Sequence, residues 1–390
     1  MPTCLILPRR IVASSPRLMS DETQLAKLPP SRAATCAPHT GLPVMTKISH
    51  QPARHASPSP QKLELTEHNG APLPRRWLIA GAAVAGIFGT AIVNQVLRRR
   101  AEAATPPLGK FVEVDGVRLH YVDEGQGPAV VLLHGNAVML QDFLASGVMT
   151  LAAEQHRVIA FDRPGFGYSE RPRSTIWTPE AQADLVANAL RQIGVKQAVM
   201  VGHSWGTMVA LAMALNHPDL VSGLVLLSGY YYGTARPDVL PASIPAIPIL
   251  GDLLAYTIVP LTGLMSGPVG IKASFAPAPV PDEIAALPKA MALRPSQVRA
   301  TAADTALMVP SAVALSKRYG EIAMPVIIMA GAGDVIVHVD EHAERLVHDI
   351  AGAKLQVVPK QGHMLHYAVP EAVVAAIDEV QARNGRSVGA

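Results

Sequence analysis

Short apolar runs separated by amphipathic stretches fill the chain from about residue 105 to its end. Near-continuous runs of valine, isoleucine, leucine and alanine are typical of strands that are buried on both faces of a sheet. A hairpin precedes them, with a tight turn at Asp115-Gly116. The runs predict strands at 129–133, 157–161, 198–201, 223–227, 325–329 and 354–358. Together they predict a mostly parallel sheet of the α/β class, with helices on both faces.

The stretches between these runs have the features of helices. Thr178 precedes Pro179, so a hydroxyl that can cap backbone N–H groups is followed by proline at the first helical position. This predicts a helix that ends near Ile193. Three more helices are predicted, at 205–216, 340–350 and 370–383. Asp340 is expected to cap the second of these three.

One long segment, residues 230–316, contains no run of the strand type. It is rich in proline, alanine, leucine, isoleucine and methionine. We expect it to be a helical cap inserted between two parts of the sheet domain, at 105–229 and 317–390. Because open α/β sheets bind ligands at the carboxyl ends of their strands, the cap is expected to lie over that edge.

The segment from Trp77 to Leu97 carries no charged residue, and arginines bracket it on both sides. As a helix it would reach about 30 Å, the thickness of a bilayer core. Its glycines are poor choices for a soluble helix and ordinary in a membrane helix. The pattern predicts a transmembrane helix at 75–100, and therefore a single-pass membrane protein with its span near the N-terminus. The arginines on both flanks leave the orientation of the span open.

Two other interpretations of this segment are open. It could be a buried hairpin helix of a soluble protein, or it could be a cleaved signal. Arg75-Arg76 resembles a twin-arginine signal, and Ala101-Glu102-Ala103 resembles a cleavage site of small residues. The three arginines just before that site argue against cleavage, because the stretch before a cut is usually uncharged.

The first 74 residues have the composition of a disordered tail, with proline, serine, alanine and basic residues in no sustained period. Met45 is a possible later start within this tail. The chain's two cysteines, Cys4 and Cys36, also lie there. The rest of the chain therefore has no disulfide framework, no thiolate nucleophile and no Cys-ligated zinc.

Charge is unevenly distributed along the chain. Residues 1–104 hold 13 basic and 5 acidic residues, a net charge of +8. Residues 105–390 hold 20 basic and 25 acidic residues, a net charge of −5. Because nucleic-acid binding depends on cationic side chains at the phosphates, no nucleic-acid partner is expected for this acidic part.

The sharpest chemical signal is Gly202-His203-Ser204-Trp205-Gly206, which lies between an apolar strand and a predicted helix. A serine in a tight strand-to-helix turn has a strained backbone and needs small residues two positions before and after it. The turn presents the serine hydroxyl above the sheet. This context predicts that Ser204 is a nucleophile, and the alternative is a turn whose serine only caps the helix.

A serine nucleophile needs a base, and the base needs an orienting group. His363 and Asp334 both follow predicted strands, at the same edge of the sheet as Ser204. We therefore expect these three side chains to form a catalytic triad. His366, one turn beyond His363, is a weaker candidate for the base, and Asp340 is a weaker candidate for the acid because it resembles a helix cap.

Two backbone N–H groups are the expected donors to an oxyanion. Trp205 lies at the start of a helix, where its N–H can stabilise negative charge. Asn136 follows His134-Gly135 after another strand, and an N–H from this loop is expected to be the second donor. We interpret the side chains of His134 and His203 as structural, and Asp162 as a carboxylate that fixes a turn rich in glycine and proline.

At this point the sequence resembles the α/β-hydrolase superfamily over roughly residues 108–385. Four motifs occur in order along the chain: His134-Gly135-Asn136, Asp-Arg-Pro-Gly-Phe-Gly-Tyr-Ser at 162–169, the segment 202–206, and Asp334 with His363. The second motif and Trp205 are most similar to the branch of epoxide hydrolases and haloalkane dehalogenases. The resemblance implies an α/β-hydrolase fold with a helical cap.

Enzymes of that branch carry an aspartate nucleophile, whereas this chain has Ser204. An alkyl-aspartate intermediate cannot form without that carboxylate. The resemblance together with serine therefore implies acyl transfer, such as hydrolysis of an ester, thioester, lactone or amide, or C–C bond hydrolysis of a diketone. Proline iminopeptidase-like members carry a Gly-Gly-Pro-Gly type loop after the first histidine, and Asn136-Ala137-Val138 departs from it.

The sequence therefore predicts a membrane-anchored serine hydrolase of small-molecule esters with apolar groups, with the lipid bilayer as its partner. The apolar preference follows from the expected cap, where only Asp252 and Lys272 are charged between 240 and 280. No metal and no organic cofactor is expected. Two alternatives are a C–C hydrolase and a non-catalytic binding protein on a hydrolase scaffold. The oligomeric state is not indicated.

Overall fold

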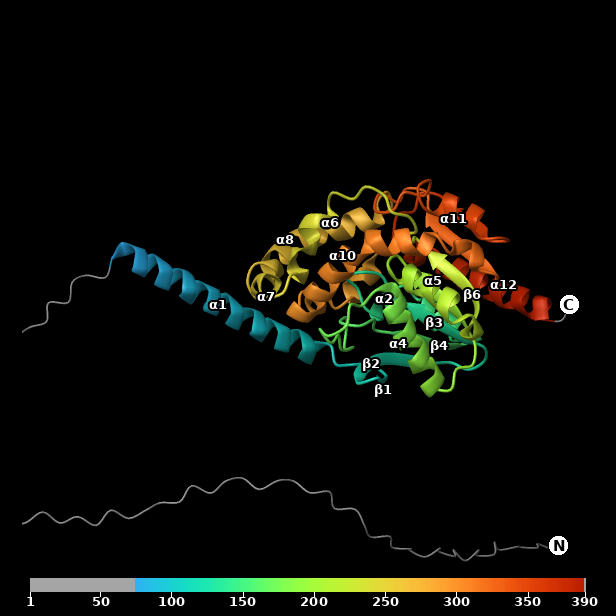
Figure 1. The fold of residues 1–390 in the computed structure, drawn as a ribbon, viewed down its shortest axis with the longest axis horizontal. Helices are drawn as coiled ribbons and strands as arrows, with labels where there is room; N and C mark the ends of the chain where they lie inside the picture. The colour runs from blue at the N-terminus through green and yellow to red at the C-terminus, as the bar shows by residue number, and fades with distance from the viewer. Residues whose placement is uncertain (1–73, 389–390) are drawn as a thin grey trace, which may run out of the picture. The chain divides into compact units, whose positions relative to one another are not determined.

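The computed structural model describes residues 74–388. The predicted tail at 1–74, with Met45 and both cysteines, lies outside the described residues except for Pro74. The described chain forms one eight-stranded sheet with helices packed around it (Figure 1). Its strands are β1 (Lys110–Val114), β2 (Val117–Glu124), β3 (Ala129–Leu133), β4 (Arg157–Phe161), β5 (Ala198–His203), β6 (Val221–Leu227), β7 (Val326–Gly331) and β8 (Lys354–Val358).

The strand order is β1-β2-β4-β3-β5-β6-β7-β8. The β1–β2 hairpin is antiparallel, and β2 also pairs antiparallel with β4. All later pairs are parallel, with Leu133 opposite Gly202 and His203 opposite Leu227. The predicted α/β class and mostly parallel sheet are therefore confirmed. Parallel pairing brings the carboxyl ends of β3, β5, β6 and β7 to one edge, where the candidate site lies.

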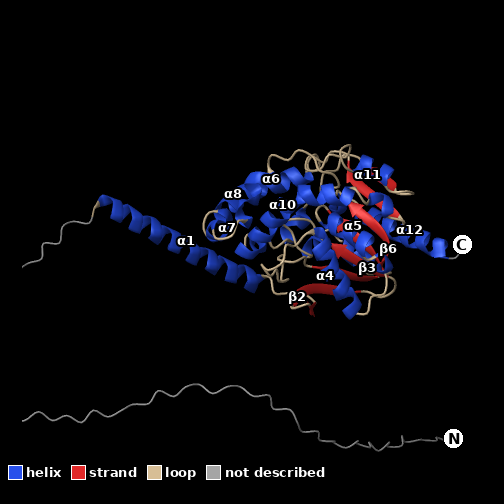
Figure 2. Cartoon of the chain, in the orientation of Figure 1, coloured by secondary structure: helices blue, strands red, loops and turns tan. Residues whose placement is uncertain are grey.

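The helices cover both faces of the sheet, as Figure 2 shows. Alternate side chains of β3 point to opposite faces, so Val131 and Leu133 pack with α4 and α5, whereas Val130 and Leu132 pack with α2, α3 and α12. The helices in these layers are α2 (Gln141–Ala145), α3 (Val148–Ala152), α4 (Pro179–Gln192), α5 (Gly206–Asn216), α11 (Ala343–Asp349) and α12 (Pro370–Val388).

Two helix starts test the predicted caps. At α4 the Thr178 hydroxyl accepts a hydrogen bond from the Ala181 N–H, and Pro179 is the first helical residue, as predicted. At α11 the prediction is wrong, because the helix begins at Ala343 and Asp340 does not cap it. His342 occupies the cap position, and its Nδ1 instead accepts from backbone N–H groups at residues 231 and 232. This tertiary contact fixes where the helix begins.

The segment between β6 and β7 is helical, as predicted, and we call residues 239–316 the helical insertion. Its longest helix, α10, contacts α5, the helix that follows Ser204. Another helix of the insertion, which contains Ser274, reaches the loop after β8, where the Met364 N–H donates to the Ser274 carbonyl. The insertion comprises α6 (Val239–Ser243), α7 (Leu250–Tyr256), α8 (Val259–Phe275), α9 (Lys289–Ala292), α10 (Pro295–Ser316) and short 3₁₀ turns at Ile244–Ala246 and Asp282–Ala286.

Helix α1 (Arg75–Ala104) begins at the predicted residue and ends four residues later than predicted. By length and composition it could cross a membrane, and most of its apolar stretch is not buried by the described chain. Its C-terminal part is different. Ala101 is buried with Met139 and Met291, and Glu102 accepts a hydrogen bond from Arg294 of the insertion at 3.2 Å. The helix is therefore joined directly to the sheet domain and the insertion.

Candidate active site

Ser204 occupies the tight turn between β5 and α5. Its φ is +52°, a conformation that is strained for a residue with a side chain. Its N–H donates to the Leu227 carbonyl at 2.9 Å, which fixes the turn to the end of β6. A Cβ on Gly206 would lie 2.1 Å from the Leu133 carbonyl oxygen, so only glycine fits there. These contacts hold the Ser204 side chain at the carboxyl edge of the sheet.

The structure brings together the three side chains of the predicted triad. The Ser204 Oγ lies 2.8 Å from Nε2 of His363, and Nδ1 of His363 lies 2.8 Å from Oδ2 of Asp334. Asp334 is itself fixed, because its Oδ1 accepts from the N–H groups of Ile336 and Val337 at 2.8 and 2.9 Å. His363 and Asp334 are buried. In this arrangement the His363 imidazole can accept the proton of the Ser204 hydroxyl, while the Asp334 carboxylate holds the other ring nitrogen.

The two expected oxyanion donors are unpaired within the described chain. Neither the Trp205 N–H nor the Asn136 N–H donates a hydrogen bond to another described residue. The loop that carries Asn136 passes close to the serine, since a Cβ built on Gly135 would lie 3.2 Å from the Ser204 Cβ. Both N–H groups are therefore free to bind an oxygen atom near Ser204.

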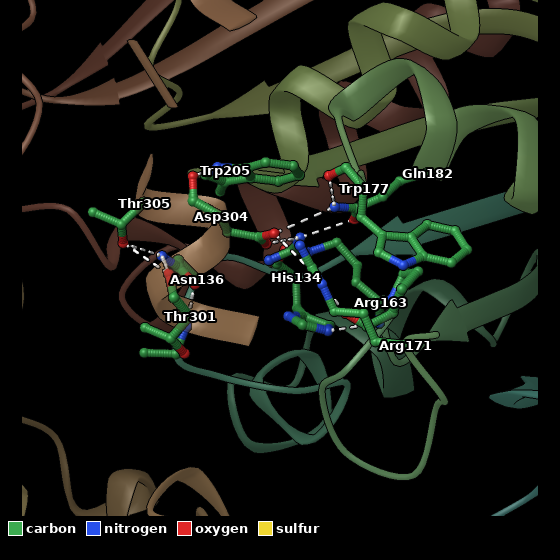
Figure 3. A network of polar contacts seen from close by, with 12 residues as sticks. His134, Asn136, Arg163, Arg171, Trp177, Gln182, Trp205, Thr301, Asp304 and Thr305 are labelled. Atoms are coloured by element: carbon green, nitrogen blue, oxygen red, sulfur yellow. Dashed lines mark hydrogen bonds and ion pairs between the residues drawn. The ribbon is translucent and has the colours of Figure 1, made fainter. Parts of the chain in front are cut away.

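The Asn136 side chain connects its loop to the helical insertion. Its Nδ2 donates to the Thr301 carbonyl at 3.1 Å and to the Thr305 hydroxyl at 3.0 Å, both on α10 (Figure 3). Its Oδ1 accepts from the Ala137 N–H at 3.0 Å. The sequence predicted a role for the Asn136 backbone, and this side-chain contact was not predicted. It places the loop in a defined position relative to α10.

Arg163 is a buried residue at the centre of the polar network in Figure 3, and the sequence analysis missed its role. Its guanidinium donates to the carbonyls of His134 and Gly135 at 2.8 and 2.9 Å. It also donates to Asp304 at 2.6 Å and lies 4.6 Å from the ring centre of Trp205. Burial lowers the pKa of Arg163, and the nearby Asp304 carboxylate opposes that change. Arg163 therefore fixes the loop that leads to Asn136.

Asp304 of α10 is the partner that joins this network to the insertion. It is fully buried and also pairs with Arg171 at 2.9 Å. Its backbone carbonyl accepts from the Trp205 indole N–H, likewise at 2.9 Å. The residue before Asn136 and the residue after Ser204 are thus both connected to α10 at Asp304, the first through Arg163 and the second through the Asp304 backbone carbonyl. A lone acidic residue in an apolar helix was the available sequence signal.

The other polar residues near the site have structural contacts, in agreement with the sequence analysis. His134 is fully buried, and its Nε2 accepts from the Arg163 N–H at 2.9 Å. Burial, together with the Arg163 charge, lowers the pKa of His134 to about 4. Asp162 accepts from the N–H groups of Leu140 and Tyr168, which fixes its turn. His366 is fully buried and contacts Asp142 at 3.1 Å, and it is His363 that contacts the Ser204 hydroxyl.

Behind His363 lies a buried group of Asp142, His203 and His366, whose ligand-type atoms are all within 4.8 Å of one another. Imidazole nitrogens and a carboxylate oxygen at this spacing are the donor types of a metal site. Asp142 already accepts hydrogen bonds from His366 and Tyr367, and His203 Nε2 lies 3.2 Å from the His363 carbonyl oxygen. We therefore interpret the group as structural, because it forms hydrogen bonds within itself and His203 contacts the His363 backbone.

We expect the protein to lose stability below about pH 6.5 because of His134 and His203. Burial holds the pKa of His134 at about 4 and that of His203 well below its usual value. As the pH falls below 6.5 these histidines become protonated in the unfolded chain but stay neutral in the folded protein. Their contribution to the free energy of unfolding is therefore full above pH 6.5 and is lost as the pH falls. Burial lowers the pKa of His342 to about 4 as well, so three such groups correspond to about 4 kcal/mol between pH 8 and pH 5.5.

Urea unfolding of the protein at pH 8, 6.5 and 5.5 measures this loss. Asp142 does not contribute to the loss in this range. Burial raises its pKa, but the charge interaction with His366 and the hydrogen bonds from His366 and Tyr367 lower it to about 2, so Asp142 affects stability only below about pH 4. A free energy of unfolding that stays constant from pH 8 to pH 5.5 would contradict the expectation.

Comparison of the sequence with known proteins identifies the family of the chain. Residues 128–368 match the family model of the alpha/beta hydrolase fold. The uncharacterized hydrolase YugF of Bacillus subtilis is 40% identical over 132 residues, which are 33% of this chain and 47% of that protein. The 2-hydroxymuconate semialdehyde hydrolase of Pseudomonas sp. is 35% identical over 32% of this chain and 44% of that protein. The chain thus spans under half the length of these two relatives.

Solved structures agree with the fold. Est816, an N-acyl homoserine lactone degrading enzyme, is 26% identical, with a TM-score of 0.54 over 69% of this chain and 99% of its own. The epoxide hydrolase CorEH is 23% identical, with a TM-score of 0.59 over 70% of this chain and 98% of its own, which supports the fold alone. With the family model covering more than half of its residues, the chain belongs to the alpha/beta hydrolase family.

Proposed function

We propose that this hydrolase is a serine enzyme that cleaves carboxylic esters with apolar groups. One observation carries the proposal. The Ser204 hydroxyl lies within hydrogen-bonding distance of His363, and Asp334 holds the other nitrogen of the same ring. In this arrangement Ser204 is the nucleophile, His363 the general base and Asp334 the group that fixes the His363 tautomer.

The reaction follows from these contacts in two steps. In the first, His363 Nε2 takes the Ser204 proton as the oxygen attacks the ester carbonyl. His363 then gives that proton to the departing alcohol, which leaves an acyl group on Ser204. In the second, His363 takes a proton from water, the hydroxide attacks the acyl group, and the proton returns to Ser204. Asp334 stabilises the imidazolium that forms in each step.

The negative oxygen in both steps would be bound by the N–H groups of Trp205 and Asn136. These N–H groups have no other partner in the described chain, and Trp205 lies at the N-terminus of α5, where the helix dipole favours negative charge. Donors that are already in place need no reorganisation as the charge develops, so they favour the transition state over the substrate.

The ester and apolar preferences rest on Ser204 and on the insertion. Serine supports acyl transfer and cannot form the alkyl-aspartate intermediate of an epoxide hydrolase or haloalkane dehalogenase. Between 239 and 281 the insertion carries only Asp252 and Lys272 as charged residues, and Phe275 packs with Met364, next to His363. The likeness to an enzyme described as degrading N-acyl homoserine lactone, a cyclic ester, supports the same class.

C–C bond hydrolysis is the second candidate. The observation that favours it is the match to 2-hydroxymuconate semialdehyde hydrolase, at 35% identity over 32% of this chain. That class of reaction also uses attack on a carbonyl, so the triad alone does not distinguish the two.

A substrate panel separates the two candidates. We expect kcat/KM for p-nitrophenyl esters to exceed that for a vinylogous diketone by at least about a hundredfold. Ester hydrolysis should also rise by about fourfold for each methylene added to the acyl chain until the pocket is filled, because each buried methylene contributes about 0.8 kcal/mol. Ser204→Ala provides the background rate. Faster cleavage of the diketone, or a preference for acetate esters, would contradict the proposal.

We also propose that α1 anchors the enzyme by spanning a bilayer. Trp77–Leu97 of α1 is uncharged and about 30 Å long, and arginines flank it at both ends. The described chain leaves most of its side chains uncovered, which a soluble core helix would not allow.

A further inference from the structure

Helix α8 of the insertion, together with the residues just before α7 and α8, carries apolar side chains that the rest of the described chain does not cover. These side chains are Ile249, Ile258, Leu261, Leu264, Met265 and Val269, and we call them the insertion face. Met265 is 81% exposed and Val269 is 70% exposed. Ile258, Leu261, Met265 and Val269 recur every three or four residues, so they lie on one side of α8. Exposed apolar side chains gathered on one face of a folded protein indicate a surface that another apolar phase or molecule covers.

The charge pattern of this region also favours an apolar environment. Asp252 is the one acidic residue between 239 and 281. The Asp252 carboxylate forms ion pairs with Arg173 at 2.7 Å and with Arg299 at 2.9 Å. Its negative charge is therefore compensated by side chains of the same protein. Lys272 lies in the last turn of α8, and its long side chain can reach water from there.

The insertion face adjoins helix α1 directly. Asn94 of α1 donates from its side chain to the carbonyls of Tyr256 and Thr257, just before α8. A shallow apolar hollow between the two helices is lined by Leu261 of α8 and by residues from Gly86 to Asn94 of α1. These α1 residues precede Leu97, the end of the uncharged run, by about 5 to 16 Å along the helix axis. The start of α8 therefore lies beside the apolar stretch itself.

We propose that the insertion face docks in the lipid bilayer beside α1. If α1 spans the membrane, the residues that touch its apolar stretch lie at the depth of the hydrocarbon, and the exposed side chains next to them are then solvated by lipid. The bilayer is the occupant because the face is continuous with the span. A second copy of the chain would have to cover the face and leave room for the lipid around α1.

If the proposed ester hydrolysis holds, docking also affects how the substrate reaches Ser204. Helix α8 runs from the α1 contact to the candidate site, a length of about 25 Å for its 17 residues. At its far end Phe275 packs with Met364, the residue after His363. We infer that an apolar ester dissolved in the bilayer enters along α8 and reaches Ser204 without passing through bulk water.

Spin-label accessibility in the full chain tests the docking. The native cysteines are replaced by Cys4→Ser and Cys36→Ser, and one nitroxide is attached through Val269→Cys. Val357→Cys on β8 is the matched control, an exposed valine outside the insertion. In phosphatidylcholine vesicles we expect the label at 269 to collide with dissolved oxygen at least about fivefold more, relative to an aqueous nickel chelate, than the label at 357.

Equal accessibility at the two positions would overturn the docking proposal. Dipolar broadening between labels at 269, with shielding from both quenchers, would also overturn it and would assign the face to a second copy. Neither readout uses catalysis, so failure of the docking and failure of the hydrolase proposal are distinguishable.

A charge variant tests the delivery of substrate. In Met265→Asp/Val269→Asp we expect the hydrolysis of a long-chain ester embedded in the same vesicles to fall about tenfold relative to that of a short soluble ester, because charge opposes lipid contact. Val357→Asp should leave this ratio unchanged. An unchanged ratio in the double variant, with the short ester still cleaved, would overturn delivery from the bilayer.

Discussion

Ser204→Ala is expected to reduce kcat for a long-chain ester by roughly 10⁴ to 10⁶-fold, because it removes the only atom that forms the acyl intermediate. His363→Ala should have an effect of similar size. The hydroxyl that remains in that variant has no base at 2.8 Å. The double variant should be no worse than either single one, since the two side chains act on the same proton.

Steady-state kinetics of the three variants, with folding checked by circular dichroism, measures this. Asp334→Asn is a graded control, because it keeps the shape of the contact to His363 and changes its charge, and it should also reduce kcat strongly. Losses that multiply in the double variant, or a Ser204→Ala enzyme that keeps more than a few per cent of the rate, would contradict the assigned roles.

Arg163→Met is expected to destabilise the fold by about 3 to 5 kcal/mol and to lower kcat in the protein that remains folded. The loss of stability follows because Asp304 would be left buried without its closest partner. The loss of kcat follows because the carbonyls of His134 and Gly135 would lose the donor that fixes the loop before Asn136. KM should change less, since Arg163 is buried below the site.

Chemical unfolding and ester kinetics measure the two effects separately. Arg163→Lys should rescue only in part, because an ammonium group cannot reach Asp304 and the carbonyls of His134 and Gly135 with the geometry of the guanidinium fork. Arg163→Met/Asp304→Leu should recover part of the stability relative to Arg163→Met, since the fully buried carboxylate is gone although Arg171 also loses its partner, and yet should stay slow. A double variant with full activity would show that the pair serves stability alone.

The sequence predicted the fold well because buried strands and turns leave local signals. The runs at 129–133, 157–161 and 354–358 match β3, β4 and β8 in both of their ends. A strand that is covered on both faces needs apolar side chains at every position, and such a run is visible without any partner. The turn at Ser204 was predictable for a similar reason, since the glycines that its geometry needs are neighbours in the chain.

The sequence could not predict contacts between distant segments. Arg163 and Asp304 are 141 residues apart, and nothing local tells which buried charge will meet which partner. The same holds for His342, which contacts the backbone at residues 231 and 232 and lies just before α11. Because the helix begins after His342, the predicted cap at Asp340 was wrong. The catalytic roles of Ser204 and His363 stay predictions, although the structure brings their side chains together.

Intact mass after treatment of the full chain with a fluorophosphonate tests the central claim most directly. Such a reagent reacts with a serine whose hydroxyl is activated by a neighbouring base. We predict one adduct per chain in the parent protein, located on Ser204, and none in Ser204→Ala or His363→Ala under the same conditions. A folded parent protein that gains no adduct, or an adduct that persists in Ser204→Ala, would contradict the claim that Ser204 is an activated nucleophile.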